Sequence, residues 1–221
     1  MMNARRLAAT VLCSAATLAL LSGCKSEGEI VVNSGVGITA VRSRCPAVGI
    51  PDYTGDITLF RGAAKTADAI DVVASMTDVR AQCSDDAANQ KVYTNVTFKV
   101  RGQRSDTSGA RQVTLPYFVS VLQGGSSVIS KRVGQVTLSF ADGESRAEAT
   151  ASGGAYVDRA AATLPEDVRE RITRKRTAGD ADAALDPLAD PTVKAAVARA
   201  SFEVLVGFQL NDDQIAYNAT R

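Results

Sequence analysis

Hydrophobic and polar residues alternate with a period of two along several stretches of this 221-residue chain. In the clearest of them, Phe202, Val204, Val206 and Phe208 share one parity, and smaller or polar residues separate them. This alternation is typical of β-strands that bury one face. The stretches that show it are residues 57–60, 70–83, 92–101, 113–121, 135–140 and 202–210.

Two irregularities in the pattern predict local departures from a regular ladder. Between residues 70 and 83 the apolar positions change parity, and one extra residue near Thr77-Asp78 restores the face, so we expect a β-bulge there. Pro116 lies within a strand stretch but cannot donate a ladder hydrogen bond, which predicts an edge position or a bulge.

Polar and glycine-rich connections separate these stretches. Residues 103–109 form a polar loop, and residues 124–127 (Gly-Gly-Ser-Ser) predict a hairpin between two strands. Six or seven short strands with turns between them indicate a mainly β fold, an antiparallel sandwich of immunoglobulin or fibronectin type. A β-barrel is the alternative.

Residues 153–200 depart from the strand pattern and predict a small helical insertion before the last strand. Thr163 and Glu166 have the spacing of a capping box, and the helix they begin is expected to end near Gly179. A second helix is expected to start at Asp190-Pro191 and to bury Val193 and its neighbours one turn apart.

The N-terminus has the arrangement of a secretory signal peptide, with Arg5 and Arg6 before an uncharged apolar region at residues 7–21. Leu21-Ser22-Gly23-Cys24 then resembles the lipobox of bacterial lipoproteins. The resemblance implies that Cys24 carries acyl chains such as palmitate and becomes the first residue of the mature protein. The alternatives are a transmembrane anchor, for which the apolar region is short of the roughly 20 residues needed, and an ordinary thiol after a plain signal peptide.

Lipidation predicts where the protein is held. Several acyl chains on one cysteine give a stable anchor, whereas one chain binds a membrane only marginally. Lys25 follows the cysteine, where an aspartate would imply retention in the inner membrane of proteobacteria. The resemblance therefore implies the outer membrane, with residues 24–44 as the lipidated cysteine and tether and residues 45–221 as a domain that faces the periplasm.

The four cysteines then resolve into distinct roles. Cys13 leaves with the signal peptide and Cys24 is acylated, so Cys45 and Cys83 remain as a pair in an oxidising compartment. We expect a disulfide between them. A redox or metal site is the alternative, but the chain has neither a CxxC spacing nor any histidine.

Charge and composition exclude several classes of function. Removal of residues 1–23 takes two of the 25 basic residues and none of the 24 acidic ones, which leaves a formal charge of −1. A near-neutral domain offers no electrostatic attraction to nucleic acid. The absence of histidine excludes Ser-His-Asp and Cys-His catalysis. We therefore expect a protein that is not an enzyme and carries no cofactor.

The remaining charged clusters have structural and functional interpretations. Asp85-Asp86 and Asp212-Asp213 are paired carboxylates of the kind glycosidases use, but such pairs more often lie in solvated loops or at a helix N-terminus. The aspartates of residues 180–190 begin like a calcium loop that lacks its third ligand and its glycine. The basic residues at 169–176 are suited either to anionic lipid heads or to the solvated end of a helix.

A wider resemblance involves three segments of the mature chain. Residues 44–48 (Arg-Cys-Pro-Ala-Val), 114–119 (Thr-Leu-Pro-Tyr-Phe-Val) and 203–210 (Glu-Val-Leu-Val-Gly-Phe-Gln-Leu) resemble a family of uncharacterised lipoproteins from alphaproteobacteria. That family has no assigned activity, so the resemblance implies a location and a fold only.

Two functional classes follow. The first is a non-enzymatic accessory or scaffold protein of the outer membrane that contacts an envelope protein partner through edge strands or end loops. The second is a carrier that holds a lipid or glycan between its sheets or under the helical insertion. A tightly filled core with an exposed apolar patch favours the first class, and an apolar pocket favours the second.

Overall fold

The structure is a computed structural model that describes residues 44–174, 176 and 179–221. The predicted signal peptide, Cys24 and most of the predicted tether lie outside these residues. The described residues fall into two units, one of residues 44–174 and 184–221 and one that contains Arg176 and residues 179–183. In the second unit, the Ala183 N–H donates to the Asp180 carbonyl across a turn (3.0 Å).

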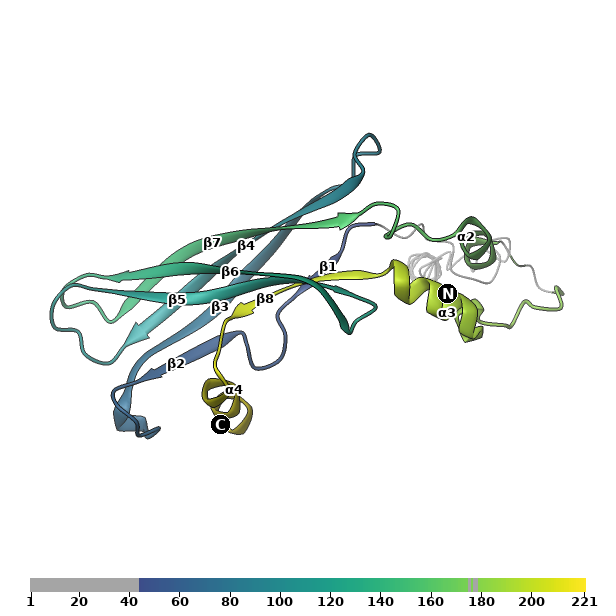
Figure 1. Ribbon diagram of the computed structural model, residues 1–221. Coiled ribbons are helices and arrows are strands. Elements are labelled where there is room, and N and C mark those ends of the chain that lie inside the picture. The colour runs from purple at the N-terminus through teal and green to yellow at the C-terminus, as the bar shows by residue number, and fades with distance from the viewer. Residues whose placement is uncertain (1–43, 175, 177–178) are drawn as a thin grey trace, which may run out of the picture. The chain divides into compact units, whose positions relative to one another are not determined.

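Two four-stranded sheets form a sandwich in the larger unit (Figure 1). The first sheet has the order β1-β8-β5-β6, and the second has the order β2-β3-β4-β7. All strand pairs are antiparallel except β1 with β8. This arrangement confirms a mainly β, antiparallel sandwich. The strands are β1 (Ala47–Gly49), β2 (Asp56–Phe60), β3 (Ile70–Ser84), β4 (Lys91–Arg104), β5 (Arg111–Gln123), β6 (Ser127–Phe140), β7 (Arg146–Asp158) and β8 (Phe202–Phe208).

Alternate side chains of both sheets fill the space between them, as the period-two pattern predicts. The rings of Phe98 on β4 and Tyr117 on β5 meet edge to face across the core, with centroids 5.0 Å apart. The largest fully buried side chains are those of Phe98, Leu115, Leu138, Phe140 and Phe208. Burial of each such group contributes about 1.5–3 kcal/mol, so this interior supplies most of the driving force for folding.

The predicted bulge in β3 is present, whereas Pro116 lies neither on an edge strand nor at a bulge. The register of β3 against β4 shifts between Thr77 and Arg80, and Asp78 has a positive φ of 51°, which confirms the bulge. Pro116 lies on β5, an inner strand, but its carbonyl accepts from the Gln209 N–H just past the end of β8. Its nitrogen therefore faces the side where β8 has ended, and no ladder hydrogen bond is lost.

The prediction that the helical segment begins at Gly153 is wrong, because β7 continues to Asp158. The inner residues of β7 are small, and a Cβ on Gly153 would lie 2.5 Å from a methyl group of Val119. Small residues let this strand approach the opposite sheet closely, but they give a weak strand signal in the sequence. The short strand β1 also has no counterpart among the predicted elements.

The two predicted helices differ from the prediction mainly at their ends. Thr163 does not cap a helix, because its hydroxyl donates to the Arg159 carbonyl, and the N-cap position belongs to Pro165. Asp190 caps the second helix as expected and accepts from the Thr192 N–H at 2.8 Å. The helices are η2 (Ala67–Ala69), α2 (Glu166–Thr173), η3 (Pro187–Ala189), α3 (Pro191–Ala200) and α4 (Asp212–Thr220).

The helix α2 thus ends at Thr173, before the predicted end near Gly179. Together with α3 it buries a small cluster of its own, separate from the sandwich core. The cluster consists of Val168, Ile172, Val193 and Ala196, with Leu164, Leu188 and Val197 against it.

Candidate functional site

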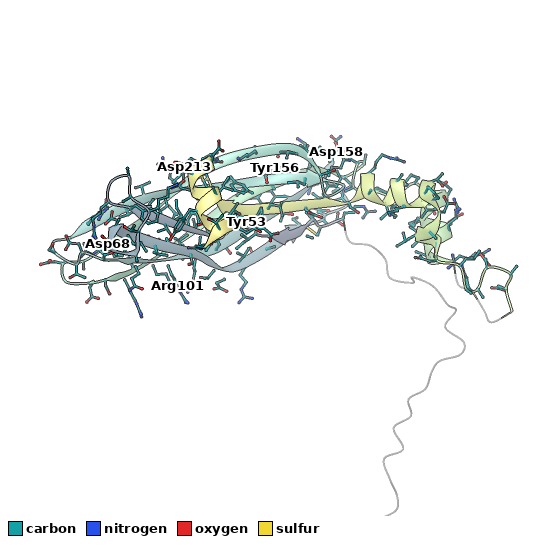
Figure 2. The ribbon with its side chains drawn as sticks, turned by 90° about the horizontal axis from the view of Figure 1, so that it is seen from below. Tyr53, Asp68, Arg101, Tyr156, Asp158 and Asp213 are labelled. Atoms are coloured by element: carbon teal, nitrogen blue, oxygen red, sulfur yellow. A yellow bond between two sulfur atoms is a disulfide. The ribbon has the colours of Figure 1, made fainter. Side chains whose placement is uncertain are left out.

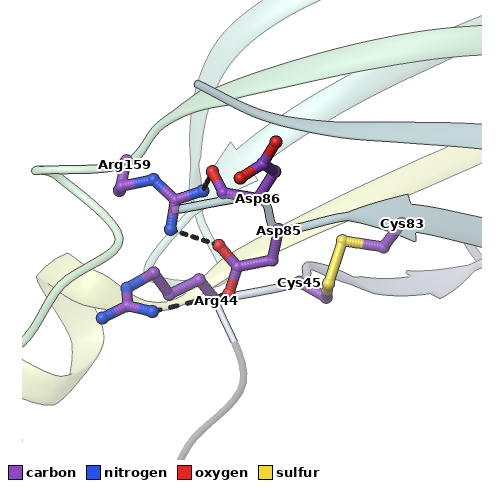
Figure 3. Close-up of a disulfide and its surroundings, with 6 residues drawn as sticks. All are labelled: Arg44, Cys45, Cys83, Asp85, Asp86 and Arg159. Atoms are coloured by element: carbon purple, nitrogen blue, oxygen red, sulfur yellow. Dashed lines mark hydrogen bonds and ion pairs between the residues drawn. A yellow bond between two sulfur atoms is a disulfide. The ribbon is translucent and has the colours of Figure 1, made fainter. Parts of the chain in front are cut away.

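The predicted disulfide between Cys45 and Cys83 is confirmed. It links the segment just before β1 to the end of β3, with the two Cα atoms 5.9 Å apart (Figure 3). The disulfide therefore fastens the point where the chain enters the sandwich from its N-terminal segment.

A cluster of charged residues surrounds this entry point (Figure 3). Asp85 pairs with Arg159 and, at 3.5 Å, with Arg44, which is the first described residue. Arg159 also donates to the carbonyls of Asp86 and Asn89. These contacts link the β3–β4 connection to the end of β7. Several polar interactions therefore stabilise the end of the sandwich at which the chain enters.

Both pairs of adjacent aspartates have structural roles near their own positions in the chain. Asp85 faces the two arginines, whereas Asp86 accepts from the Ala88 N–H at 3.0 Å and shapes the turn. Asp212 and Asp213 lie in the first turn of α4, where the helix dipole favours acids; Figure 2 shows Asp213 on this helix. This helix N-terminus is one of the two interpretations that the sequence left open.

The acidic and basic runs around the helical segment largely satisfy each other. Arg169 pairs with Glu166, and Arg171 pairs with Asp190. Hydrogen bonds from Thr192 and from Arg171 hold the pKa of the Asp190 carboxyl well below its usual range. Within the described ranges, no group of three or more acidic, cysteine or histidine side chains is placed to hold a metal ion.

The first half of β6, residues 127–133, stands out as an exposed strand edge, and we call it the open edge. All seven of its side chains are exposed, with Val128 at 62%, Ile129 at 55% and Val133 at 60%. Burial returns in the second half of the strand, where Val136, Leu138 and Phe140 enter the core. In the described part of the chain β6 pairs with β5 alone, so the other side of its backbone has no strand partner.

Tyr117 marks the point where the open edge begins. Its ring lies against Gly134, where an added Cβ would come within 2.5 Å, and its hydroxyl donates to the Ser152 carbonyl of β7 at 2.8 Å. Tyr117 thereby bridges β6 and β7 at this position. Beyond it β6 and β7 separate toward the β5–β6 hairpin, as Figure 1 shows.

The other sheet edges are short or expose only alternate side chains. The strand β1 has three residues. Edge strand β2 is held by α4, because the side-chain amide of Asn218 donates to the carbonyls of Tyr53 and Asp56, each at 2.8 Å. The end of β7 buries Ala155 and Val157. Among the edge strands of the described sheets, the open edge of β6 is thus the longest run of consecutive exposed residues.

The open edge is also basic. No aspartate or glutamate occurs from residue 111 to residue 140. Lys131 lies over the Phe118 ring at 4.9 Å, and among the described residues neither Lys131 nor Arg132 forms an ion pair. By contrast Arg111, at the far end of the hairpin, makes a bidentate pair with Asp71 that lowers the pKa of this carboxyl.

The sequence pattern predicts a strand at residues 135–140 but does not predict the open edge. The available signal was the β-branched content of Val128, Ile129 and Val133. The register of β6 against β5 shifts at Ile129, since Val128 faces Leu122 while Ser130 faces Val121. This bulge interrupts the alternation that would have revealed the strand.

No helix in the described residues is long and apolar enough to cross a membrane. Comparison of the chain with family models, with curated proteins and with solved structures finds no match.

Proposed function

We propose that this protein is a lipid-anchored accessory protein of the bacterial outer membrane that binds a protein partner through the open edge of β6. The observation that carries the proposal is the exposure of residues 127–133, together with a backbone side that pairs with no strand of the described residues. An exposed strand edge offers a row of hydrogen-bonding groups to which an extended segment adds as a further strand. Binding of this kind requires neither a catalytic group nor a cofactor.

The packing of the interior favours this function over that of a lipid or glycan carrier. A carrier needs a pocket of several hundred Å³ lined by apolar groups. In this sandwich, aromatic side chains such as Phe98, Phe140 and Phe208 lie between the sheets with 2% exposure or less. The apolar groups that remain exposed, among them Val128, Ile129 and Val133, suit contact with another protein.

We expect a Cys24→Ser variant to lose its membrane anchor. This expectation rests on the lipobox-like sequence at residues 21–24 and on the lysine that follows it. Without a thiol to acylate, the protein should accumulate with its signal peptide or leave the outer-membrane fraction. Cell fractionation and intact-protein mass spectrometry measure both. A variant that is cleaved normally and stays in the outer membrane contradicts the lipoprotein proposal.

A photo-crosslinking amino acid at Val133 tests the docking edge in living cells. We expect a discrete adduct with one envelope protein from position 133 and none from Arg101, an exposed position on the outer face of the second sheet. Equal adducts at both positions, or none at position 133 in a folded and anchored protein, contradict docking at this edge.

A further inference from the structure

We propose that the open edge of β6 selects an extended, acidic segment of its partner, which pairs with residues 130–133 as an added strand. This inference rests on the proposed docking function and adds the chemistry of the partner.

The charge of the edge favours an acidic strand. Lys131 and Arg132 stand next to each other on the open edge, and the β5–β6 hairpin supplies no acid between residues 111 and 140. Opposite charges on facing strands attract, whereas like charges that face each other destabilise a strand pair. Glutamate or aspartate at alternate positions of an incoming strand lies on one face of the sheet and would face either Lys131 or Arg132 there.

The direction of the free backbone groups follows from the register of the first sheet. Pro116 directs its carbonyl toward β8. Successive residues of a strand direct their backbone groups to opposite sides, so Val119 and Val121, at odd separations from Pro116, direct theirs toward β6. Their register partners Arg132 and Ser130 bond to β5, which leaves the N–H and C=O groups of Lys131 and Val133 facing outward. An incoming strand can therefore bond at these two residues without disturbing the existing ladder.

A second copy of the chain fits this edge poorly. Antiparallel pairing of two open edges would bring four cations into one short ladder with no acid to offset them. The bulge at Ile129 further limits a regular self-pairing of the edge. The features that oppose association with a like copy favour a partner of opposite charge.

The test uses two eight-residue probe peptides, one that alternates valine with glutamate and one that alternates valine with lysine. Backbone-amide NMR of the purified mature protein follows each titration. We expect shifts of the Lys131 and Val133 amides with the glutamate peptide, and binding about ten-fold tighter than that of the lysine peptide. Added salt should weaken the preferred complex, since both sets of charges are exposed.

Two variants separate charge from backbone pairing. A Lys131→Glu/Arg132→Glu variant should prefer the lysine peptide. Val133→Pro removes an outward N–H and should abolish binding of both peptides while the circular dichroism spectrum is kept, and Val133→Ala is its matched control because it keeps this N–H.

The proposal is overturned by equal binding of the two peptides, or by a preference that survives charge reversal. Concentration-dependent dimers that pair through Val133 would assign the edge to a second copy. Tighter peptide binding after deletion of residues 25–43 would assign it to the chain's own N-terminal segment. A cellular adduct at position 133 without any charge preference keeps the docking function and overturns the acidic partner alone.

Discussion

Replacement of Arg104 by methionine is expected to lower the free energy of unfolding by about 3–5 kcal/mol. Arg104 ends β4 with only 2% of its surface exposed, and its guanidinium donates four hydrogen bonds of 2.8 Å to backbone carbonyls. It also lies 5.3 Å from the centre of the Phe140 ring. These carbonyls belong to Thr107, Gly109, Ala141 and Glu144.

The loss is large because four buried carbonyl contacts of the β4–β5 loop and the β6–β7 turn lose a charged donor. Two other hydrogen bonds that join these connections remain, from the Gly143 N–H to the Thr107 carbonyl and from the Gly109 N–H to the Asp142 carboxylate. One guanidinium holds the β4–β5 loop and the β6–β7 turn together, and methionine fills similar space without a donor. Lysine keeps the charge, but its compact ammonium cannot reproduce the planar fork of donors, so Arg104→Lys should fall between the two. Urea denaturation followed by circular dichroism gives the free energies of unfolding.

Arg101→Met is the matched control for this prediction. Arg101 lies on the same strand, but its side chain is 63% exposed and pairs with Glu148 on the outer face. Exposed pairs of this kind contribute about 0–1 kcal/mol. Equal losses at the two positions, or a loss below about 1 kcal/mol at Arg104, would show that the carbonyls find water when the guanidinium is removed.

The sequence predicts strands well where large apolar side chains alternate, as in β4, β5 and β8. It fails for β7, whose inward positions carry the small residues Ala147, Ala149 and Ala151. This strand is defined by its thirteen-residue register with β4 and by close approach to the facing sheet. Such tertiary contacts override local strand propensity and are not visible in a single sequence.

The start of a helix is also only partly predictable from capping motifs in the sequence. Thr163 and Glu166 have the spacing of a capping box, but the threonine hydroxyl bonds to Arg159 and Arg44 instead. A capping box with both hydrogen bonds forms at Asn211 and Gln214, at the start of α4. The spacing motif is local, whereas the partner that the threonine finds is 119 residues away in the chain.

The candidate site was the least predictable part of the molecule. Strand content near Val128 and Ile129 is visible in the sequence, but the exposure of the strand depends on where β6 separates from β7. That point is set by Tyr117, Gly134 and Ser152, which come from three different strands. An edge is a property of the assembled sheet, so it requires the structure, whereas the charge of the hairpin can be read directly from the residues.

Removal of the disulfide by a Cys45→Ser/Cys83→Ser variant is expected to lower the free energy of unfolding by about 4 kcal/mol. The crosslink spans 38 residues, and the estimate follows from the chain entropy that the unfolded state regains when this loop is opened. Against a usual total of roughly 5–15 kcal/mol, this loss is a large share of the stability. Denaturation of the wild-type protein with and without reductant should reproduce the difference.

The ion pairs beside the disulfide help to separate its effect on the folded state from its effect on the unfolded chain. Without the crosslink, Asp85 still pairs with Arg44 and Arg159, and these contacts can hold the entry point in the folded state. They do not act on the unfolded chain, where most of the entropic effect arises. A loss near 4 kcal/mol with unchanged peptide binding at the open edge therefore supports a purely stabilising role. A loss below about 1 kcal/mol would indicate that the reduced, unfolded chain is already compact, and the chain-entropy account would then fail for this protein.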